Sequence, residues 1–347
     1  MAQTMKDRPF KPLLKQDLEH VLNHARQDLD RLRGARLFMT GGTGFFGKWL
    51  ASSFVKANST LRLSATLVLL TRDPEKFRQQ NPDFAADPSI SLWQGDVRSF
   101  DFPPGQFTHI IHGASGPGNR PLEMFDITVE GTRRALQCAA QAGAKRFLFL
   151  SSGAVYGPQP AAMTHIPETY SGGPDPLLPG SEYGEAKRAA EHLSVNYSRA
   201  NEFEATIARC FTFCGPHLPL ALNFAIGNFI ADALAKRPIS VQGDGTTYRS
   251  YLYTADLAVW LWALLVRGKN ERAYNVGSDE EVTIATLAQT VANVAGSPQG
   301  IQITQQPKPG AAPLRYVPSV ERARSELGLE PLIKLKEGIR RTLDWLC

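Results

Sequence analysis

The stretch ARLFMTGGTGFFGKWLASSFVKAN, residues 35–58, joins an apolar run to a helix-like segment through a turn rich in glycine. Gly41, Gly44 and Gly47 directly follow the apolar run, at the spacing of a turn that binds a pyrophosphate. Gly41 allows the tight turn, Gly44 lets the backbone approach the phosphates, and Gly47 permits close packing of helix on strand. The N-terminus of the helix then faces the phosphate charge. This stretch therefore predicts a dinucleotide site at the first strand of a parallel sheet.

Apolar runs and helix-like segments alternate beyond this turn. A helix-like segment covers residues 127–143, and short apolar runs cover 65–71, 91–97, 109–115 and 146–152. Continuous apolar runs are typical of strands buried on both faces, and their alternation with helices is typical of a parallel sheet. The sequence predicts the α/β class, with a doubly wound parallel sheet covered by helices on both faces.

The composition changes toward both ends of the chain. Residues 1–33 place leucines at near-helical spacing between charges, which predicts an amphipathic helical extension without a chemical role. After about residue 210 prolines and glycines multiply and helix-like segments dominate, which indicates a second, smaller lobe. We therefore expect the sheet domain over 34–210, with returns near 247–277, and the lobe mainly over 211–347.

Composition and charge exclude several classes of protein. The chain has 347 residues, of which 43% are hydrophobic and 20% charged, and its net charge is +5. A mild basic excess, without a Lys/Arg run interleaved with aromatic residues, favours an anionic small substrate over nucleic acid. The N-terminus lacks the apolar core of a signal peptide, and no stretch reaches the roughly 20 apolar residues of a membrane span. We expect a cytoplasmic protein with neither a nucleic-acid nor a membrane partner.

The cysteines indicate neither a disulfide framework nor a metal centre. They are scattered through a long chain, at Cys138, Cys210, Cys214 and Cys347. The spacing of Cys210 and Cys214 suggests a pair of metal ligands, but no further His or Cys cluster completes the set. We therefore expect these two to be core cysteines, and we expect no metal.

The residues that end the second and third apolar runs bear on the choice of cofactor. An NAD site normally has an acidic residue at the end of the second strand, where it binds the ribose 2′-hydroxyl. Thr71 stands there, followed by Arg72 and Asp73, and Arg72 permits a contact with a 2′-phosphate. The sequence leaves NAD and NADP both open. Asp96 ends the third run, where an acidic side chain can meet the adenine amino group or form a turn.

A tyrosine and a lysine stand four residues apart in EYGEAK, residues 182–187, and therefore lie on one face of a helix. Tyrosine is a poor base at its free pKa near 10, but a nearby ammonium and an oxidised nicotinamide favour the phenolate. We therefore predict that Tyr183 moves a proton, while Lys187 activates it and holds the ribose hydroxyls. Ser152 ends the fifth apolar run and is expected to assist. The small residues after it leave room for a substrate ring.

Six motifs taken together resemble the extended short-chain dehydrogenases/reductases, and more narrowly the NAD-dependent epimerase/dehydratase family that acts on nucleotide sugars. They are TGGTGFFG, SSGAVYG, YGEAK, RCFTFCGP, GDGTTYRSYLYTAD and YNVGS, in family order from about residue 35 onward. The resemblance implies a Rossmann-type domain with a smaller nucleotide-sugar-binding lobe, Ser/Thr-Tyr-Lys catalysis and a homodimer. By motif position it implies that Ser152 hydrogen-bonds the substrate hydroxyl, Tyr183 is the base and Lys187 is its activator.

The resemblance also implies which residues contact the ligands. Cofactor contacts are expected at the glycine turn, at strand ends and at the catalytic pair: Gly41, Thr43, Gly44, Phe45, Phe46, Gly47, Thr71, Arg72, Asp96, Val97, Ala114, Ser115, Tyr183, Lys187 and Phe211. Substrate contacts are expected at Ser152, Thr212, Asn223, Arg249 and Arg315. Arg249 would hold a substrate phosphate, with Arg315 assisting it.

Departures from the family pattern help to choose among its activities. Family members that dehydrate or decarboxylate resemble one another in carrying acids just after the catalytic Ser/Thr. Gly153 and Ala154 stand there in this chain, and neither can transfer a proton. Thr212 replaces the asparagine of the family's RxxNxxGP stretch, and Thr128 replaces that of NxxGT. Loss of the acids favours a reaction that needs only a tyrosine and a nicotinamide.

Epimerisation at C4 of a nucleotide sugar is such a reaction. The tyrosine takes the proton of the 4-hydroxyl while hydride leaves C4, and the transient 4-keto sugar turns over before hydride returns. We therefore predict a nucleotide-sugar 4-epimerase that uses NAD or NADP. The alternative is an NADPH-dependent 4-ketoreductase or dehydrogenase of an activated sugar. A dehydratase or decarboxylase with unusual acids, and a non-enzymatic sensor of redox state or nucleotide, are further alternatives.

Overall fold

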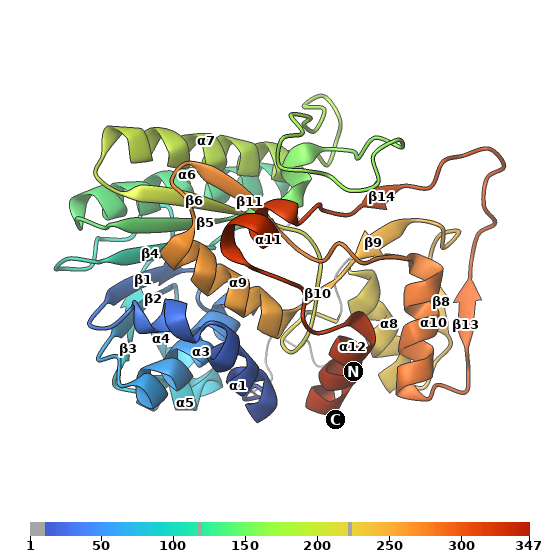
Figure 1. Ribbon diagram of the computed structural model, residues 1–347, viewed down its shortest axis with the longest axis horizontal. Coiled ribbons are helices and arrows are strands. Elements are labelled where there is room, and N and C mark those ends of the chain that lie inside the picture. The colour runs from blue at the N-terminus through green and yellow to red at the C-terminus, as the bar shows by residue number, and fades with distance from the viewer. Residues whose placement is uncertain (1–10, 117–119, 221–223) are drawn as a thin grey trace. The chain divides into compact units, whose positions relative to one another are not determined.

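The computed structural model describes residues 11–116, 120–220 and 224–347. Its largest sheet has seven strands in the order β11-β6-β5-β4-β1-β2-β3 (Figure 1). These strands are β1 (Arg36–Thr40), β2 (Thr66–Thr71), β3 (Ile90–Gln94), β4 (His109–His112), β5 (Arg146–Ser152), β6 (Glu204–Cys210) and β11 (Arg272–Val276). The pairings from β3 through β6 are parallel, which confirms the predicted α/β fold class. The strand order reverses at β1, so the crevice at the ends of β1 and β4 is the expected ligand site.

Helices cover both faces of this sheet (Figure 1). The helices associated with it are α3 (Phe45–Leu61), α4 (Pro74–Gln80), α5 (Pro82–Ala86), α6 (Pro121–Gln141), α7 (Glu182–Ala200) and α9 (Thr254–Arg267). Helices α6 and α7 pack together on one face, and α3 and α9 lie on the other (Figure 1). The indole nitrogen of Trp262 in α9 donates to Ser53 Oγ in α3 at 2.9 Å.

The N-terminal extension packs on the sheet domain. It contains α1 (Lys15–His24) and α2 (Arg26–Asp30), which both contact α3. The buried Asp28 carboxylate accepts hydrogen bonds from the Arg267 guanidinium at 2.6 and 3.1 Å. The extension is therefore fixed to the end of α9 by a partly buried ion pair and packs against α3.

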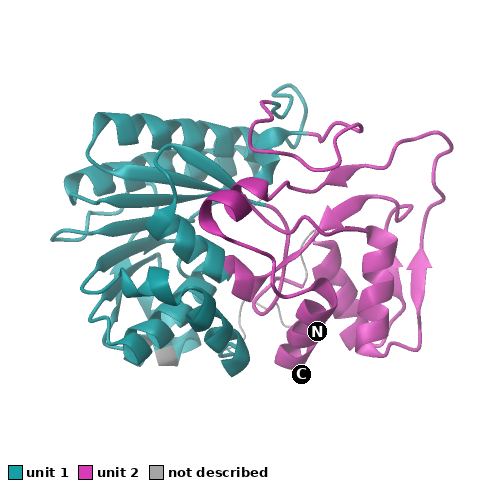
Figure 2. Cartoon of the chain, in the orientation of Figure 1, with its two compact units in different colours: residues 1–157, 172–210, 258–274 teal, residues 158–171, 211–257, 275–347 magenta. Residues whose placement is uncertain are grey.

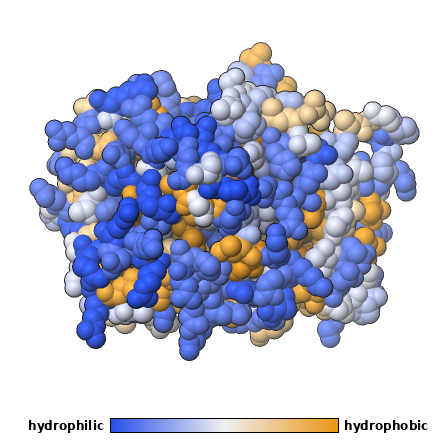
Figure 3. All heavy atoms as spheres, viewed as in Figure 1, coloured by the Kyte–Doolittle hydropathy of each residue, from blue (hydrophilic) through white to orange (hydrophobic). Residues whose placement is uncertain are grey.

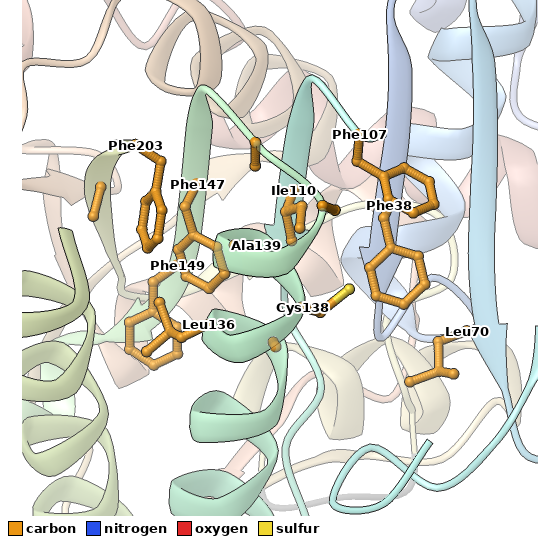
Figure 4. Packing of buried hydrophobic residues seen from close by; sticks show 14 of the residues in the cluster. Phe38, Leu70, Phe107, Ile110, Leu136, Cys138, Ala139, Phe147, Phe149 and Phe203 are labelled. Atoms are coloured by element: carbon orange, nitrogen blue, oxygen red, sulfur yellow. The ribbon is translucent and has the colours of Figure 1, made fainter. Parts of the chain in front are cut away.

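The core between the sheet and α6 is rich in phenylalanine (Figure 4). Phe38 of β1 and Phe107 have ring centroids 5.4 Å apart, and Phe147 of β5 is as deeply buried. From α6, Leu136 lies beside Phe149 and Cys138 lies on the side of Phe38, and both are fully buried. Burying a side chain of this kind contributes roughly 1.5–3 kcal/mol. This packing fixes the strands in register, and with them the loops that carry the site.

The chain divides into two compact units (Figure 2). Unit 1 contains residues 1–157, 172–210 and 258–274, and unit 2 contains 158–171, 211–257 and 275–347. Residues 258–274 return to unit 1, and residues 158–171 belong to unit 2. There the Ile166 amide donates to the Val317 carbonyl at 2.9 Å, and Asn275 donates to the Ile166 carbonyl at 2.8 Å.

Unit 2 is built from three small sheets, β10-β7, β12-β9-β14 and β13-β8. Their strands are β7 (Phe213–Cys214), β8 (Ile239–Val241), β9 (Tyr248–Ser250), β10 (Leu252–Tyr253), β12 (Glu281–Thr283), β13 (Ile301–Ile303) and β14 (Arg315–Tyr316). Its helices are α8 (Ala225–Leu234), α10 (Ile284–Ala295), α11 (Glu321–Leu327) and α12 (Leu335–Leu346). α8 and α10 pack on each other and on β8, which gives this unit its own core.

Within the described residues, no helix is both long enough and apolar enough to cross a membrane. Hydrophilic residues prevail on the face shown in Figure 3, where hydrophobic residues lie in small groups. Cys210 and Cys214 are buried, as expected for core cysteines, and Cys138 is buried with them. Cys347, at the end of α12, is exposed. The described residues contain no cluster of three or more His, Cys, Asp or Glu side chains that could hold a metal ion.

Candidate active site

The glycine turn between β1 and α3 brings backbone close to backbone. Gly41 has a φ of +75°, and a Cβ there would lie 2.6 Å from the Gly113 carbonyl carbon. A Cβ on Gly47 would lie 2.4 Å from Gly42, so α3 can start against the turn only without a side chain at this position. A Cβ on Gly44 would meet only the Gly41 carbonyl oxygen, at 3.3 Å. No side chain caps α3 at Gly44. The helix N-terminus therefore presents its amides and dipole to an anion, and fits the pyrophosphate of a dinucleotide.

The neighbouring residues of the turn are accessible in differing degrees. Thr43 is exposed, while Phe45 and Phe46, the first residues of α3, are half-buried with ring centroids 5.3 Å apart. After the end of β4, Ser115 is exposed and Ala114 is half-buried. The contacts of these residues with a cofactor stay a prediction.

A buried histidine ties the turn to β4, a feature that the sequence did not predict. Thr132 Oγ1 donates to the Thr128 carbonyl at 2.6 Å, so its lone pairs accept from His112 Nε2 at 3.0 Å. His112 Nδ1 must then accept from Thr40 Oγ1, at 2.6 Å, and Thr40 Oγ1 in turn accepts from the Ala114 amide at 3.3 Å. This chain of hydrogen bonds assigns one tautomer of neutral histidine.

Electrostatics keeps the same histidine neutral. Burial, with repulsion from the Lys187 ammonium, lowers the pKa of His112 to about 3. A positive charge would break the hydrogen bond that Nδ1 accepts, so neutrality preserves the link between the end of β1 and the end of β4. A polar residue that ends the apolar run HIIH is the sequence signal that could have revealed this link. Thr128, one of the departures from the family pattern, bonds within α6, where its hydroxyl donates to the Met124 carbonyl at 2.8 Å.

At the end of β2, the side chains expected near the ribose have defined partners. Thr71 is buried, and its Oγ1 accepts from the Asp73 amide at 3.3 Å. The Asp73 carboxylate caps α4 by accepting from the Lys76 amide at 2.9 Å. Arg72 is exposed and makes no ion pair with a described carboxylate. Asp73, the acidic residue nearest to the strand end that binds the ribose 2′-hydroxyl in NAD sites, thus serves as a helix cap.

Asp96, expected at the adenine, is engaged by its own neighbour. Arg98 donates from Nε and Nη2 to the two carboxylate oxygens at 2.8 and 3.1 Å. These hydrogen bonds lower the pKa of Asp96 and keep it ionised. The next residue, Val97, packs against α6. A Cβ added to Gly131 of this helix would lie 2.9 Å from a Val97 methyl group. The carboxylate therefore has a local structural role, and an adenine contact stays a prediction.

The catalytic residues meet at the end of β5. Ser152 ends this strand and caps the short helix η2 (Gly153–Tyr156) by accepting from the Ala154 amide at 3.2 Å. Its hydroxyl is hydrogen-bonded to the Tyr183 phenol on α7. One helical turn further on, the buried Lys187 donates to the Leu150 carbonyl at 2.8 Å, and its Nζ lies 5.9 Å from the centre of the Tyr183 ring. The structure thus brings all three predicted catalytic residues together.

Burial opposes ionisation of both members of the pair. It raises the pKa of Tyr183, although the hydrogen bond from Ser152 acts in the opposite direction. It lowers the pKa of Lys187 to about 8. In the protein by itself, desolvation of the phenolate outweighs the hydrogen bond from Ser152. The joint effect expected from Lys187 and an oxidised nicotinamide stays a prediction.

In unit 2, the two predicted phosphate-binding arginines differ in their partners. Arg315 on β14 pairs with the Glu281 carboxylate and stacks 4.0 Å over the Tyr248 ring. Arg249 on β9 is half-buried and makes no ion pair with a described carboxylate; its Nη1 donates to the Tyr248 carbonyl at 3.0 Å. Burial without a counterion lowers the pKa of Arg249. Arg249 therefore remains able to bind an anion, whereas the charge of Arg315 is already balanced.

The other predicted contacts of this unit have local roles. Phe211 is buried, with its ring centroid 4.7 Å from that of Tyr316. The Thr212 hydroxyl donates to the Ser250 carbonyl and thereby links β7 to the end of β9. Asn223 lies outside the described residues. A ligand contact of Phe211 or Thr212 stays a prediction.

Comparison with known proteins agrees with this geometry. A model of the NAD dependent epimerase/dehydratase family matches residues 37–277. UDP-glucuronic acid decarboxylase 2 of Arabidopsis thaliana is 30% identical over 309 residues, which cover 88% of this chain and 67% of that protein.

Solved structures share the fold. RMD from Pseudomonas aeruginosa, solved with NADPH, matches with a TM-score of 0.70 and 26% identity over 90% of this chain and 98% of that one. UDP-N-acetylglucosamine 4-epimerase from Methanobrevibacter ruminantium M1 matches with a TM-score of 0.77 over 90% of this chain and 98% of that one. The latter is 18% identical, so its likeness shows the fold alone. On the family match, the glycine turn and the Ser-Tyr-Lys group, the chain belongs to the NAD-dependent epimerase/dehydratase family of extended short-chain dehydrogenase/reductase enzymes.

Proposed function

We propose that the chain is a nucleotide-sugar 4-epimerase that works through a transient 4-keto sugar. The observation that carries the proposal is the contrast at the end of β5. Ser152, Tyr183 and Lys187 stand together, whereas the following residues of η2, Gly153 and Ala154, bear no acid. This set can oxidise and reduce a carbinol carbon but offers no local group for the proton transfers of elimination.

Each residue has a distinct task in this reaction. Tyr183 takes the proton of the 4-hydroxyl and later returns it to the ketone oxygen. Ser152 holds that oxygen through its hydroxyl, which is hydrogen-bonded to Tyr183. Lys187 is buried against the same face of α7 and favours the phenolate by its charge. A bound nicotinamide supplies the hydride acceptor, and then the donor, at C4. The glycine turn and the N-terminus of α3 would hold its pyrophosphate.

Arg249 is proposed to hold a phosphate of the nucleotide sugar. It is half-buried and has no described carboxylate partner, so an anion would supply its missing counterion. The Arabidopsis relative is named for UDP-glucuronic acid, which makes UDP sugars the first substrates to test. Decarboxylation is disfavoured because Gly153 and Ala154 bear no acid and the buried carboxylate of Glu191 is bound to Arg209.

A 4-ketoreductase is the second candidate, and Arg72 favours it. This exposed arginine follows β2, while the Asp73 carboxylate is used as the cap of α4. A free guanidinium in this position suits the 2′-phosphate of NADP, the cofactor typical of reductases. The likeness to RMD, solved with NADPH, supports the same choice. We therefore propose NADP as the preferred cofactor.

A product screen separates these candidates. The purified protein is incubated with UDP-, GDP-, CDP- and dTDP-sugars, and products are identified by chromatography and NMR. An epimerase gives an isomer of equal mass without net change in cofactor absorbance. A reductase instead consumes NADPH in proportion to a supplied 4-keto sugar. Release of CO2 with formation of a pentose nucleotide would overturn both proposals. Sedimentation tests the homodimer implied by the family resemblance, and fractionation of cells tests the predicted cytoplasmic location.

A further inference from the structure

A bridge of three side chains links α6 to β4 and β1, and each hydrogen bond in it has a defined direction. Thr132 on α6 donates to the Thr128 carbonyl at 2.6 Å and accepts from His112 Nε2 at 3.0 Å. His112 Nδ1 accepts from the Thr40 hydroxyl at 2.6 Å, and the same hydroxyl accepts from the Ala114 amide at 3.3 Å. This threonine–histidine bridge, formed by Thr132, His112 and Thr40, therefore needs a neutral histidine with its proton on Nε2.

The threonine–histidine bridge ends where two segments of the expected cofactor site touch. Thr40 immediately precedes Gly41 of the glycine turn, and Ala114 lies in the loop that follows β4. A Cβ on Gly41 would lie 2.7 Å from the Ala114 nitrogen, so the turn and this loop are in contact. The Thr40 carbonyl accepts from the Gly113 amide at 3.1 Å, and the Thr40 hydroxyl accepts from the next amide of the loop. Thr40 thus holds two successive amides of the loop against the turn.

The surroundings of His112 hold its ring in one orientation. The ring is fully buried, and its centroid lies 5.8 Å from that of Phe149 and 6.2 Å from that of Phe147. Because the pKa of His112 is lowered to about 3, the imidazole is neutral near pH 7. Both ring nitrogens are hydrogen-bonded, so rotation of the ring would break buried bonds that water cannot replace. The bridge is therefore a rigid link that fixes the rotamer of Thr40.

We propose that His112 is a positioning residue for the dinucleotide cofactor. Through the Thr40 hydroxyl it holds the glycine turn and the loop after β4 at one separation, so that their backbone groups can contact the same dinucleotide. His112 needs no contact with the cofactor, because its ring is fully buried and both of its nitrogens are bonded within the protein. The role concerns the dinucleotide, and it therefore applies to an epimerase and to a reductase alike.

The other end of the same pair of strands offers a matched control. Thr108, just before β4, donates to the Arg36 carbonyl at 3.1 Å and accepts from the Arg36 amide at 3.2 Å. Its hydroxyl also lies 2.8 Å from His109 Nδ1. Thr108 thus joins β1 to β4 beside a histidine, as Thr40 does, but at the amino ends of the strands, whereas ligands of such sheets bind at the carboxyl ends. Loss of either hydroxyl should lower stability, but loss of the Thr108 hydroxyl should not affect the cofactor.

Thr40→Val and Thr108→Val separate the two roles, because valine keeps the shape of threonine and lacks its hydroxyl. Binding of NADH and NADPH to the purified proteins, stripped of cofactor, is measured by fluorescence titration. We expect the dissociation constant of the better-bound dinucleotide to rise about tenfold in Thr40→Val and to stay within about twofold of the wild type in Thr108→Val. Thr132→Val should raise it about threefold, because Thr132 reaches the turn through His112. Thr40→Ser, which keeps the hydroxyl, should bind as the wild type does.

Nitrogen-15 NMR of labelled histidine gives a readout that needs no cofactor. The His112 signals, assigned by comparison with His112→Gln, should show a proton on Nε2 and no titration from about pH 5 to about pH 9. A proton on Nδ1 would overturn the proposal. Unchanged cofactor affinity in folded Thr40→Val, or equal losses in Thr40→Val and Thr108→Val, would overturn it as well. If Thr40→Val does not fold, Thr132→Val provides the decision, and wild-type affinity in that variant would count against the proposal in the same way.

Discussion

Replacing Lys187 by methionine should stabilise the protein at neutral pH while abolishing its catalysis. Burial lowers the pKa of Lys187 from 10.5 to about 8, so keeping this side chain charged inside the protein costs free energy. At about 1.36 kcal/mol for each pKa unit, the cost is about 3 kcal/mol at pH 7. This is an upper limit for the gain, since methionine leaves the Leu150 carbonyl without the donor that now lies 2.8 Å away.

The sign of the pH dependence is a sharper test than the size of the gain. The unfolded chain keeps this proton up to about pH 10.5, whereas the folded chain loses it near pH 8. The unfolded state therefore binds more protons between these values, and wild-type stability rises with pH across this window. From pH 7 to about pH 9.5, the wild type should gain about 2 kcal/mol relative to Lys187→Met.

Urea unfolding of the two proteins at both pH values measures this difference. Other groups that titrate in the same range contribute equally to both proteins and cancel. A free energy difference that does not change with pH would refute the argument that Lys187 is charged and buried at neutral pH. A change in the opposite direction would mean that the folded protein raises the pKa of this lysine.

Three further substitutions address the reaction and its ligands. Tyr183→Phe should lower kcat by about 10²–10⁴-fold with nearly unchanged cofactor binding, as judged by steady-state kinetics and fluorescence titration; equal turnover would remove the phenol from the mechanism. Arg249→Ala should raise KM for the nucleotide sugar by about tenfold, because a charge-assisted bond is lost. Arg315→Ala should raise KM less, because Glu281 already balances the charge of Arg315. A larger increase in KM for Arg315→Ala than for Arg249→Ala would exchange the roles of the two arginines. Arg72→Ala should reduce the preference for NADP over NAD by about tenfold in competition assays, and an unchanged preference would argue for another 2′-phosphate contact.

Features that depend on neighbours in the sequence were predictable. The glycine turn needs only its spacing, and the positive φ of Gly41 with the close approach of Gly47 agrees with the roles inferred for them. Tyr183 and Lys187 share a face because they are one helical turn apart. Alternation of apolar runs and helices was sufficient for the fold class, since a parallel strand requires a crossover helix.

Features that depend on register between distant strands were not predictable. His112 gains its role from Thr40, 72 positions away, and the Glu191 carboxylate accepts from Ser151, 40 positions away. Arg249 and Arg315 look alike in the sequence, and only the pairing of Arg315 with Glu281 distinguishes them. The rise in the Tyr183 pKa likewise reflects burial, which no local motif reports.

The fate of an isotope at C4 tests the proposed reaction most directly. A UDP-sugar deuterated at C4 is incubated with the protein in ordinary water, and the product is examined by NMR and mass spectrometry. The account predicts an isomer of unchanged mass that keeps deuterium at C4 and takes up no solvent hydrogen at C5. A product that has lost CO2 or water, or one that carries solvent hydrogen at C5, would contradict it.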